Sequence, residues 1–264
     1  MITSIENKQI KQIMQLNTKA KARKKAGLFA VEGVKMFLEA PDKQIAEVYV
    51  SESFYNSEEG RQVLLQKKRE CQVVSDKIFS QVCDTLTPQG ILTLVHFPEW
   101  REEQVFDHKE KTPLILVLDT IQDPGNLGTM IRTGEGAGLT GVVMNKNTVD
   151  IFNPKTIRAT MGSIYRIPFL ITEDLTATIA KMKERGIHTY AAHLKGQKDF
   201  YREEFMGPTA FFIGNEGNGL SEEVAALADT YVKIPMEGQV ESLNAAIAAS
   251  VMMYECKRQR DVQA

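Results

Sequence analysis

The sequence predicts an α/β protein in which a doubly wound parallel sheet follows a smaller α/β domain. Residues 114–118 form a continuous apolar run, which is typical of a strand buried on both faces of a parallel sheet. Strand-like and helix-like stretches alternate after Pro113 at the spacing of βαβ units. Residues 98–103 are polar and turn-prone and residues 107–111 are charged, and we place a linker in this stretch. We therefore expect one domain at residues 1–105 and another at 112–264.

The elements of the first domain follow from local pattern. Residues 3–25 have helical spacing, with Ile10, Ile13 and Met14 on one face. Short strands are predicted at residues 28–33, 45–50, 71–74 and 91–96, and helices at 34–40, 60–70 and 76–83.

The second domain is predicted in the same way. Its strands are expected at residues 114–118, 141–144, 167–170, 188–193, 209–214 and 231–234. Its helices are expected at residues 127–137, 154–161, 174–185 and 221–227, and after Asn244. In this last helix Leu243, Ile247 and Val251 recur at helical spacing, which favours a core face. Ser242 and Asn244 are both good helix-capping residues.

Composition limits the class of protein. The chain has 264 residues, 43% hydrophobic and 25% charged, with a net charge of −2, as in soluble globular proteins. No apolar run is long enough to span a membrane, and the first residues lack the order of a signal peptide. The three cysteines, Cys71, Cys83 and Cys256, form no C-x-x-C pair. We expect reduced, buried thiols in a cytoplasmic protein without a membrane partner.

One segment departs from this average. The first 25 residues carry seven basic side chains against the single acid Glu6, a local charge of +6. Such a run is either a solvated helix face or a patch that faces nucleic-acid phosphates and gains affinity by releasing counterions.

Several common chemistries are excluded by their motifs. Gly134, Gly136 and Gly138 follow a helix-like segment, which is the wrong context for a dinucleotide fingerprint. The loop Gly214–Gly219 does follow a strand, but Glu216 would repel a pyrophosphate. Neither a Walker lysine motif nor a G-x-S-x-G elbow occurs, and the four histidines match no zinc spacing. We therefore expect no metal.

Three loops at the carboxyl ends of predicted strands remain as candidates: residues 119–133, 214–219 and 234–244. Open α/β sheets place their ligands at such strand ends. The loops offer asparagine, arginine, glutamate and serine side chains, and glycines that permit close backbone approach. This set orients a substrate without supplying a nucleophile, which favours a group transfer driven by a bound cofactor.

The motifs in these loops resemble a known family. They read Asp123-Pro-Gly-Asn-Leu-Gly-x-x-x-Arg132, Ile213-Gly-Asn-Glu-Gly-x-Gly-Leu220 and Ile234-Pro-Met-x-Gly-x-x-x-Ser-Leu-Asn244. With Asn153-Pro-Lys-x-x-Arg-Ala-x-Met-Gly-Ser163, they resemble the SpoU (TrmH-like) family of RNA ribose 2′-O-methyltransferases over residues 112–258. Residues 24–33 resemble part of the substrate-binding domain often attached to it, which is similar to RNA-binding ribosomal proteins.

The resemblance implies a SPOUT fold with a trefoil knot, a homodimer, S-adenosylmethionine bound in the knot, and RNA as substrate. By position, it implies a cofactor pocket formed by Gly214, Ile234, Met236 and Leu243. The implied reaction residues are Asn126, Arg132, Glu216, Ser242 and Asn244, with Arg132 either a base or a clamp on phosphate and alkoxide. The N-terminal domain favours 23S rRNA as substrate. A tRNA substrate and a non-catalytic RNA-binding ribosome-assembly protein are the alternatives.

Overall fold

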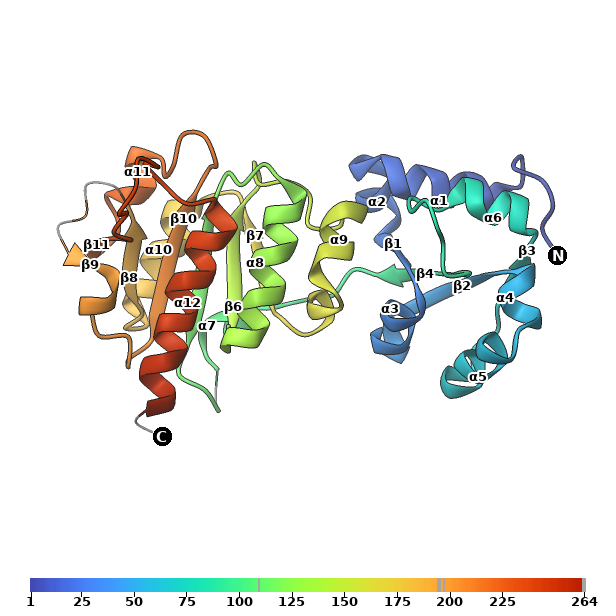
Figure 1. The fold of residues 1–264 in the computed structure, drawn as a ribbon, viewed down its shortest axis with the longest axis horizontal. Helices are drawn as coiled ribbons and strands as arrows, with labels where there is room; N and C mark the ends of the chain where they lie inside the picture. Colours follow the sequence, from blue (N-terminus) through green and yellow to red (C-terminus); the bar gives the residue numbers. More distant parts are fainter. Residues whose placement is uncertain (109, 194–195, 197, 263–264) are drawn as a thin grey trace. The chain divides into compact units, whose positions relative to one another are not determined.

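The computed structural model describes residues 1–108, 110–193, 196 and 198–262, which form two compact units (Figure 1). The first unit comprises residues 1–99 and 152–165, and the second comprises residues 100–151 and 166–264. Residues 152–165 thus pack with the first unit although they lie inside the expected second domain. The expected division into domains at residues 105–112 stays a prediction.

The first unit is a four-stranded mixed sheet in the order β1-β4-β2-β3. Strands β1 and β2 pair antiparallel with β4, and β3 pairs parallel with β2. The strands are β1 (Leu28–Glu32), β2 (Ile45–Ser51), β3 (Gln72–Val74) and β4 (Ile91–His96). The helices are α1 (Lys8–Thr18), α2 (Ala20–Ala26), α3 (Val34–Glu39), η1 (Asp42–Gln44), α4 (Glu52–Asn56), α5 (Glu58–Lys67), α6 (Asp76–Val82), α9 (Pro154–Thr160) and η2 (Ser163–Tyr165). The four predicted strands are confirmed.

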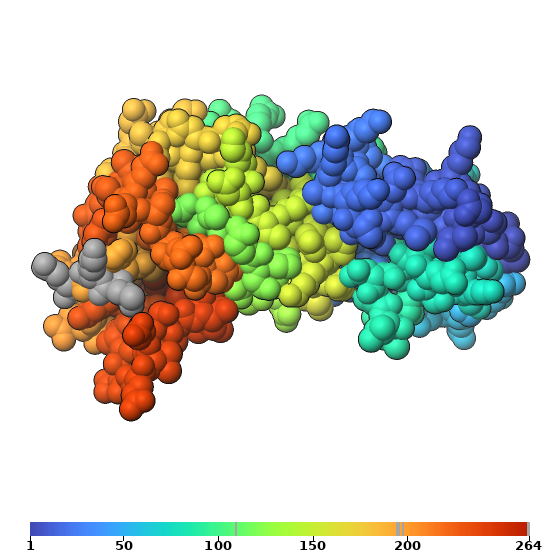
Figure 2. Space-filling view, turned by 90° about the horizontal axis from the view of Figure 1, so that it is seen from above, coloured from blue at the N-terminus to red at the C-terminus, as the bar shows by residue number. Residues whose placement is uncertain are grey.

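The single helix expected at residues 3–25 is two helices, α1 and α2. The chain is extended at Lys19, which has φ −123° and ψ 112°, and this breaks the helical hydrogen-bond ladder. Ile10, Ile13 and Leu16 are buried as expected from their spacing, whereas Met14 is exposed. Figure 2 shows this N-terminal segment, in the darkest blue, along one face of the first unit.

Aromatic side chains attach residues 152–165 to the rest of the first unit. The Phe152 ring stacks on Phe97 with centroids 3.8 Å apart and planes at 7°, and its centroid lies 4.9 Å from that of Phe29. The Tyr165 hydroxyl donates to the carbonyl oxygen of Met36 (3.2 Å). The helix predicted at residues 154–161 is confirmed as α9.

The second unit is a seven-stranded sheet in the order β7-β6-β5-β10-β8-β11-β9, and every pairing in it is parallel. Its strands are β5 (Leu114–Asp119), β6 (Gly141–Asn145), β7 (Phe169–Thr172), β8 (His188–Ala192), β9 (Lys198–Asp199), β10 (Thr209–Gly214) and β11 (Thr230–Lys233). Its helices are α7 (Glu102–Phe106), α8 (Pro124–Ala137), α10 (Leu175–Glu184), η3 (Phe200–Arg202), α11 (Glu222–Ala225) and α12 (Ala245–Val262). The predicted parallel α/β architecture is confirmed; β9 was not predicted.

Helices cover both faces of this sheet, so its central strands are buried on both sides. Ile115, Val117 and Phe212 pack against Ile179 and other residues of α10 in one core cluster. On the opposite face α12 lies beside α8 and also contacts β10 (Figure 1). Every residue of β5 is buried, which explains its uninterrupted apolar sequence.

The expected linker at residues 98–111 contains the short helix α7. Val105 and Phe106 of this helix are buried, and the Val105 side chain lies so close to Gly141 that a β-carbon there would be 2.5 Å away. The linker interpretation was wrong for these residues because two apolar side chains among charged neighbours give no local pattern.

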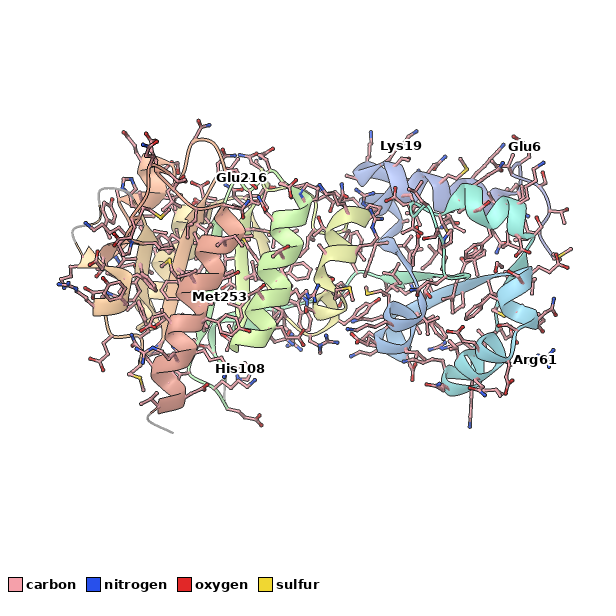
Figure 3. The ribbon with its side chains drawn as sticks, in the orientation of Figure 1. Glu6, Lys19, Arg61, His108, Glu216 and Met253 are labelled. Atoms are coloured by element: carbon pink, nitrogen blue, oxygen red, sulfur yellow. The ribbon has the colours of Figure 1, made fainter. Side chains whose placement is uncertain are left out.

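The core face of the last helix also differs from the prediction. Ala246, Ala249, Met253 and Cys256 are buried, whereas Ile247 is 49% exposed. Figure 3 labels Met253 on α12. The buried face therefore begins with two alanines, which allow close packing, and continues with Met252, Met253 and Cys256.

The three cysteines are free thiols, and only Cys256 is fully buried; Cys71 and Cys83 are half-buried. No helix in the described part of the chain has the length and apolar character needed to cross a membrane.

Candidate active site

The candidate site lies where the strand order of the second unit reverses. After β5 the chain adds β6 and β7 on one side, whereas β10 and β8 lie on the other. The crevice outside the carboxyl ends of strands at such a point is the usual ligand site of an open α/β sheet. The loops after β5, β10 and β11 all reach this edge.

A cavity of about 300 Å³ opens between the last two of these loops. Residues 213–220 form one wall, and parts of residues 232–236 and 241–248 form another. All four residues expected to contact a cofactor line this cavity, as do two of the expected reaction residues: Gly214, Ile234, Met236, Leu243, Glu216 and Ser242. The lining is therefore mostly apolar, with a few polar groups that can fix a ligand's orientation.

Gly214 is required by close backbone packing. A β-carbon at this position would lie 2.1 Å from the carbonyl carbon of Gly219 and 2.1 Å from the nitrogen of Leu220. The loop is closed by two reciprocal backbone hydrogen bonds of 2.9 Å between Asn215 and Gly219. Because both contacts are to backbone, no side-chain movement could make room for an alanine.

Glu216 joins this loop to the loop after β5 (Figure 3). Its carboxylate accepts hydrogen bonds from the backbone nitrogens of Gln122 and Asp123, both at 3.0 Å, and from Asn126 Nδ2 at 2.9 Å. Burial acts to raise the pKa of Glu216, but these three donors outweigh it and hold the pKa below its ordinary value. The carboxylate is therefore ionised at neutral pH.

Asn126 connects Glu216 to the third loop. Helix α8 begins at Pro124, with Asp123 as its N-cap, so it starts earlier than the predicted Leu127 and places Asn126 in its first turn. Asn126 Oδ1 accepts from Asn244 Nδ2 at 3.1 Å. Glu216, Asn126 and Asn244 thus form one hydrogen-bonded chain across three loops.

Of the two residues expected to cap helix α12, Asn244 does so and Ser242 does not. Its Oδ1 accepts from the backbone nitrogens of Ala246 (2.9 Å) and Ile247 (3.3 Å). A capping role for Ser242 was wrong, because the helix starts at Ala245 and Ser242 lies outside its first turn. The exposed Ser242 instead faces the cavity.

Arg132 is the expected site residue that the structure does not bring to the others. It lies on an exposed face of α8 and makes no hydrogen bond or ion pair with any residue that the structure describes. Its guanidinium is therefore available to an external group.

Sequence reasoning missed several residues that build this site. His193 lines the cavity and stacks on Tyr231 with ring centroids 5.2 Å apart. Asn215 donates to the carbonyl oxygen of Thr120 (2.9 Å), and Asp119 is buried under the same loops. The one available signal was the polar Asp119 at the end of an apolar strand.

The seven basic side chains of the first 25 residues have different surroundings in the structure. Arg23 is buried and donates to the carbonyl oxygen of Leu16, and Lys11 pairs with Glu6. The remaining five are exposed and have no hydrogen-bond or ion-pair partner among the described residues: Lys8, Lys19, Lys21, Lys24 and Lys25.

Within the described ranges, no three histidine, cysteine, aspartate or glutamate side chains are arranged to hold a metal ion.

Comparisons with known proteins agree with this geometry. The profile of the SpoU rRNA Methylase family matches residues 113–254, and that of the MRM3-like substrate binding domain matches residues 7–93. The chain is 34% identical to the 23S rRNA (guanosine(2553)-2'-O)-methyltransferase RlmP of Bacillus subtilis, over 97% of this chain and 98% of the relative. It is 30% identical to the 23S rRNA (guanosine-2'-O-)-methyltransferase RlmB of Pseudomonas putida, over 89% and 97%.

Solved structures show the same fold. The crystal structure of the SpoU methyltransferase AviRb from Streptomyces viridochromogenes with AdoMet superposes with a TM-score of 0.88 at 26% identity, covering 97% of this chain and 99% of that one. The AdoMet-bound rRNA methyltransferase from Sinorhizobium meliloti gives a TM-score of 0.83 at 29% identity, with 97% coverage of both chains. The chain belongs to the SpoU rRNA methylase family.

Proposed function

We propose that this protein is an S-adenosylmethionine-dependent methyltransferase that methylates a ribose 2′-hydroxyl in 23S rRNA in the cytoplasm. The observation that carries the proposal is the chain Glu216–Asn126–Asn244 beside a largely apolar cavity at the reversal of the strand order. The names of the relatives, two of which are 23S rRNA 2′-O-methyltransferases, support the substrate class.

The residues around the cavity fit S-adenosylmethionine. Ile234, Met236 and Leu243 offer apolar surface to an adenosine, and Gly214 lines the cavity where its loop packs backbone against backbone. Glu216, Glu241 and Lys233 give the cavity charges of both signs, which suits a ligand that carries both cationic and anionic groups. When bound, the cofactor supplies an electrophilic methyl group on a sulfonium.

The chain's own residues orient the nucleophile. Asn126 is fixed on both sides, because its amide donates to Glu216 and accepts from Asn244. Ser242 lines the cavity and Asn244 follows the lining residue Leu243, so a hydroxyl and an amide are at hand to hold a ribose. Such pre-organised groups would lower the barrier by fixing the orientation of the 2′-hydroxyl before it reacts.

Arg132 is the cation that the family resemblance assigns to the reaction, and two roles are open to it. As a clamp, its planar guanidinium would bind the phosphate next to the target ribose and stabilise the developing alkoxide. As a base, it would have to lose a proton, which a guanidinium in a protein resists. The clamp is chemically easier, and it is supported by the exposure of Arg132, which has no partner among the residues that the structure describes.

A pH–rate profile of Arg132→Lys separates the two roles. The clamp predicts a low rate that stays flat with pH, since lysine lacks the bidentate fork. A rate that recovers as the pH approaches the lysine pKa would contradict the clamp and support the base.

We also propose that the C-terminal segment is threaded into a trefoil knot. Strand β11 lies two positions from β10 in the sheet, yet the helix that follows it packs against α8 and β10. The connecting residues 234–244 line the same cavity as loop 214–220. An experimental density map in which residues 234–244 pass outside loop 214–220 would contradict the knot.

A homodimer is proposed from the outer face of α12. Ile247 and Tyr254 are 49% and 48% exposed, and the partly buried Val251 lies between them at helical spacing. An apolar stripe of this kind is typical of an interface. Sedimentation equilibrium should give a dimer for the wild type and a monomer for Ile247→Asp. A monomeric wild type would refute the proposal.

RNA docking is proposed for the lysines of α2, Lys21, Lys24 and Lys25, which we call the α2 lysine face. Each is exposed and free of protein partners among the described residues, so each can release counterions at a phosphate. The match of residues 7–93 to a substrate binding domain supports this role over a merely solvated face.

Calorimetric titration with S-adenosylmethionine tests whether the protein binds the proposed cofactor. Saturable binding is expected, weakened in Leu243→Asp, which places a charge on the apolar wall. Absence of binding by the wild type would refute the enzyme and favour a non-catalytic ribosome-assembly protein. Binding combined with methylation of tRNA alone would contradict the 23S rRNA substrate and leave the proposed enzyme activity in place.

A further inference from the structure

A buried carboxylate lies beneath the loops of the candidate site and has no part in the proposed chemistry. Asp119 ends strand β5 and is only 5% exposed. Both its oxygens are fully engaged. Oδ2 accepts from the backbone nitrogen of Ser221 (2.9 Å) and from its hydroxyl (2.7 Å). Oδ1 accepts from Asn145 Nδ2 (2.8 Å) and from the Thr120 hydroxyl (3.0 Å).

These four bonds join three segments that are distant in sequence. Ser221 is the residue directly after loop 214–220, Asn145 ends strand β6, and Thr120 begins the loop that carries Gln122, Asp123 and Asn126. Asp119 therefore contacts the base of loop 214–220, which carries Glu216, and the base of the loop after β5, which carries the donors to Glu216.

The backbone of Thr120 is held in a conformation that a threonine does not favour. Its φ is +61°, which lies in a left-handed region that β-branched residues rarely adopt. Asn145 holds it there, because Asn145 Oδ1 accepts from the Thr120 nitrogen (3.2 Å) and Nδ2 donates to the Thr120 hydroxyl (2.9 Å). In this conformation the Thr120 carbonyl accepts from Asn215 Nδ2 (2.9 Å), the second link between the loops.

We infer that Asp119 is a positioning residue, which fixes loop 214–220 through Ser221 and the Thr120 loop through Thr120 and Asn145. By doing so it sets the cavity wall and aligns Glu216 with Asn126. This inference rests on the proposed function for its consequence, which is tight cofactor binding. The alignment itself is a property of the chain alone.

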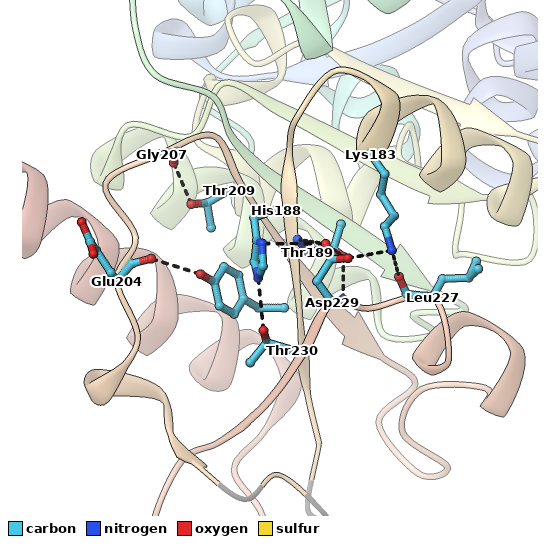
Figure 4. Close-up of polar contacts among 10 residues, drawn as sticks. Lys183, His188, Thr189, Glu204, Gly207, Thr209, Leu227, Asp229 and Thr230 are labelled. Carbon is cyan, nitrogen blue, oxygen red and sulfur yellow. Dashed lines mark hydrogen bonds and ion pairs between the residues drawn. The ribbon is translucent and has the colours of Figure 1, made fainter.

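The chain offers a matched control at the opposite end of the strands in the same sheet, and Figure 4 shows its polar contacts. Asp229 precedes strand β11 and accepts from the backbone nitrogen of Thr189 (2.9 Å) and from its hydroxyl (2.7 Å), the same pair of distances that Ser221 gives to Asp119. Lys183 also pairs with it at 2.7 Å. This cluster lies at the amino ends of β8 and β11, whereas the cavity lies at the carboxyl ends.

The experiment compares Asp119→Asn with Asp229→Asn. An amide has one acceptor atom, so in either orientation Asp119→Asn leaves donors of Ser221, or of Asn145 and Thr120, unpaired. We expect Asp119→Asn to raise the Kd for S-adenosylmethionine about tenfold, as for the loss of one charged hydrogen-bond network. Asp229→Asn should leave that Kd unchanged, even where both variants lower the thermal midpoint equally.

The conservative pair at Ser221 adds a rescue. Ser221→Ala loses the hydroxyl but keeps the backbone donor and should bind more weakly than the wild type, whereas Ser221→Thr restores the hydroxyl and should bind normally. Equal weakening in Asp119→Asn and Asp229→Asn, or wild-type binding by Asp119→Asn, would overturn the inference in favour of a purely structural role.

Hydrogen exchange without cofactor keeps the test independent of the proposed function. Asp119→Asn should lower the protection of the Gly217 and Asn218 amides, which donate to Asn215 Oδ1, and of Gln122, which donates to Glu216. Asp229→Asn should not. Unchanged protection in Asp119→Asn contradicts the inference even if the wild type binds no S-adenosylmethionine, an outcome that would by itself refute only the proposed function.

Discussion

Replacing Glu216 by glutamine should loosen the loop after β5 by an amount that can be worked from its hydrogen bonds. The carboxylate accepts from two backbone nitrogens and one amide, and glutamine keeps only one acceptor oxygen. A hydrogen bond to a charged group contributes about 1.5–3 kcal/mol when buried. Glu216 is exposed, so solvent screening reduces this to about 1 kcal/mol per stranded donor.

The assay is amide hydrogen exchange at Gln122 and Asp123. A loss of about 1 kcal/mol corresponds to a roughly fivefold fall in protection. Glu237→Gln, an equal charge change on an exposed loop residue without hydrogen-bond partners among the described residues, should leave both amides unaffected. Protection in Glu216→Gln equal to that of the wild type would refute the reasoning.

The same variant predicts a pH dependence. The folded-state pKa of Glu216 lies below its ordinary value of 4.5, because its hydrogen bonds outweigh burial. The contribution of the carboxylate is therefore fully present above about pH 4.5 and is lost as the pH falls through the folded-state pKa. The difference in protection between wild type and Glu216→Gln should shrink over that acidic range. A difference that stays constant down to pH 3 would contradict the pKa direction.

Three further predictions concern the loop glycine, the buried arginine and the α2 lysine face. Gly214→Ala should destabilise the protein by about 2 kcal/mol through backbone overlap and weaken cofactor binding, whereas Gly238→Ala, with open space around its β-carbon, should do neither in thermal-shift and calorimetric assays. Arg23→Ala should lower the free energy of unfolding by about 2 kcal/mol by leaving the Leu16 carbonyl unpaired, and equal stability of Arg23→Ala and Lys24→Ala would refute that structural role. Neutralising the α2 lysine face should reduce the salt slope of RNA binding by about 2 without changing stability, and an unchanged slope would remove it from the interface.

Much of the fold could be predicted because its signals are local. The apolar runs of β5 and β10 predict buried parallel strands, and the carboxyl ends of these strands locate the loops of the site. Helix α7 could not be predicted, since only tertiary burial explains Val105 and Phe106. The orientation of α12 was missed because an alanine-rich helix gives little contrast between its faces.

The candidate site was predictable as a set of residues but not as a network. The motifs single out Asn126, Glu216 and Asn244, and the structure joins them through side-chain hydrogen bonds. Asp119 carries no motif signal, since its partner Ser221 lies 102 residues away. The strained conformation of Thr120 is likewise invisible in the sequence, because it is imposed by Asn145 from a neighbouring strand.

The most direct test of the central claim is methyl transfer to unmodified 23S rRNA transcribed in vitro. The purified protein is incubated with this RNA and methyl-labelled S-adenosylmethionine, and the RNA is digested to nucleosides and analysed by mass spectrometry. The account predicts label in a single 2′-O-methylated nucleoside, and its loss in Arg132→Ala. Label on a base, or no incorporation into the 23S rRNA, would contradict it.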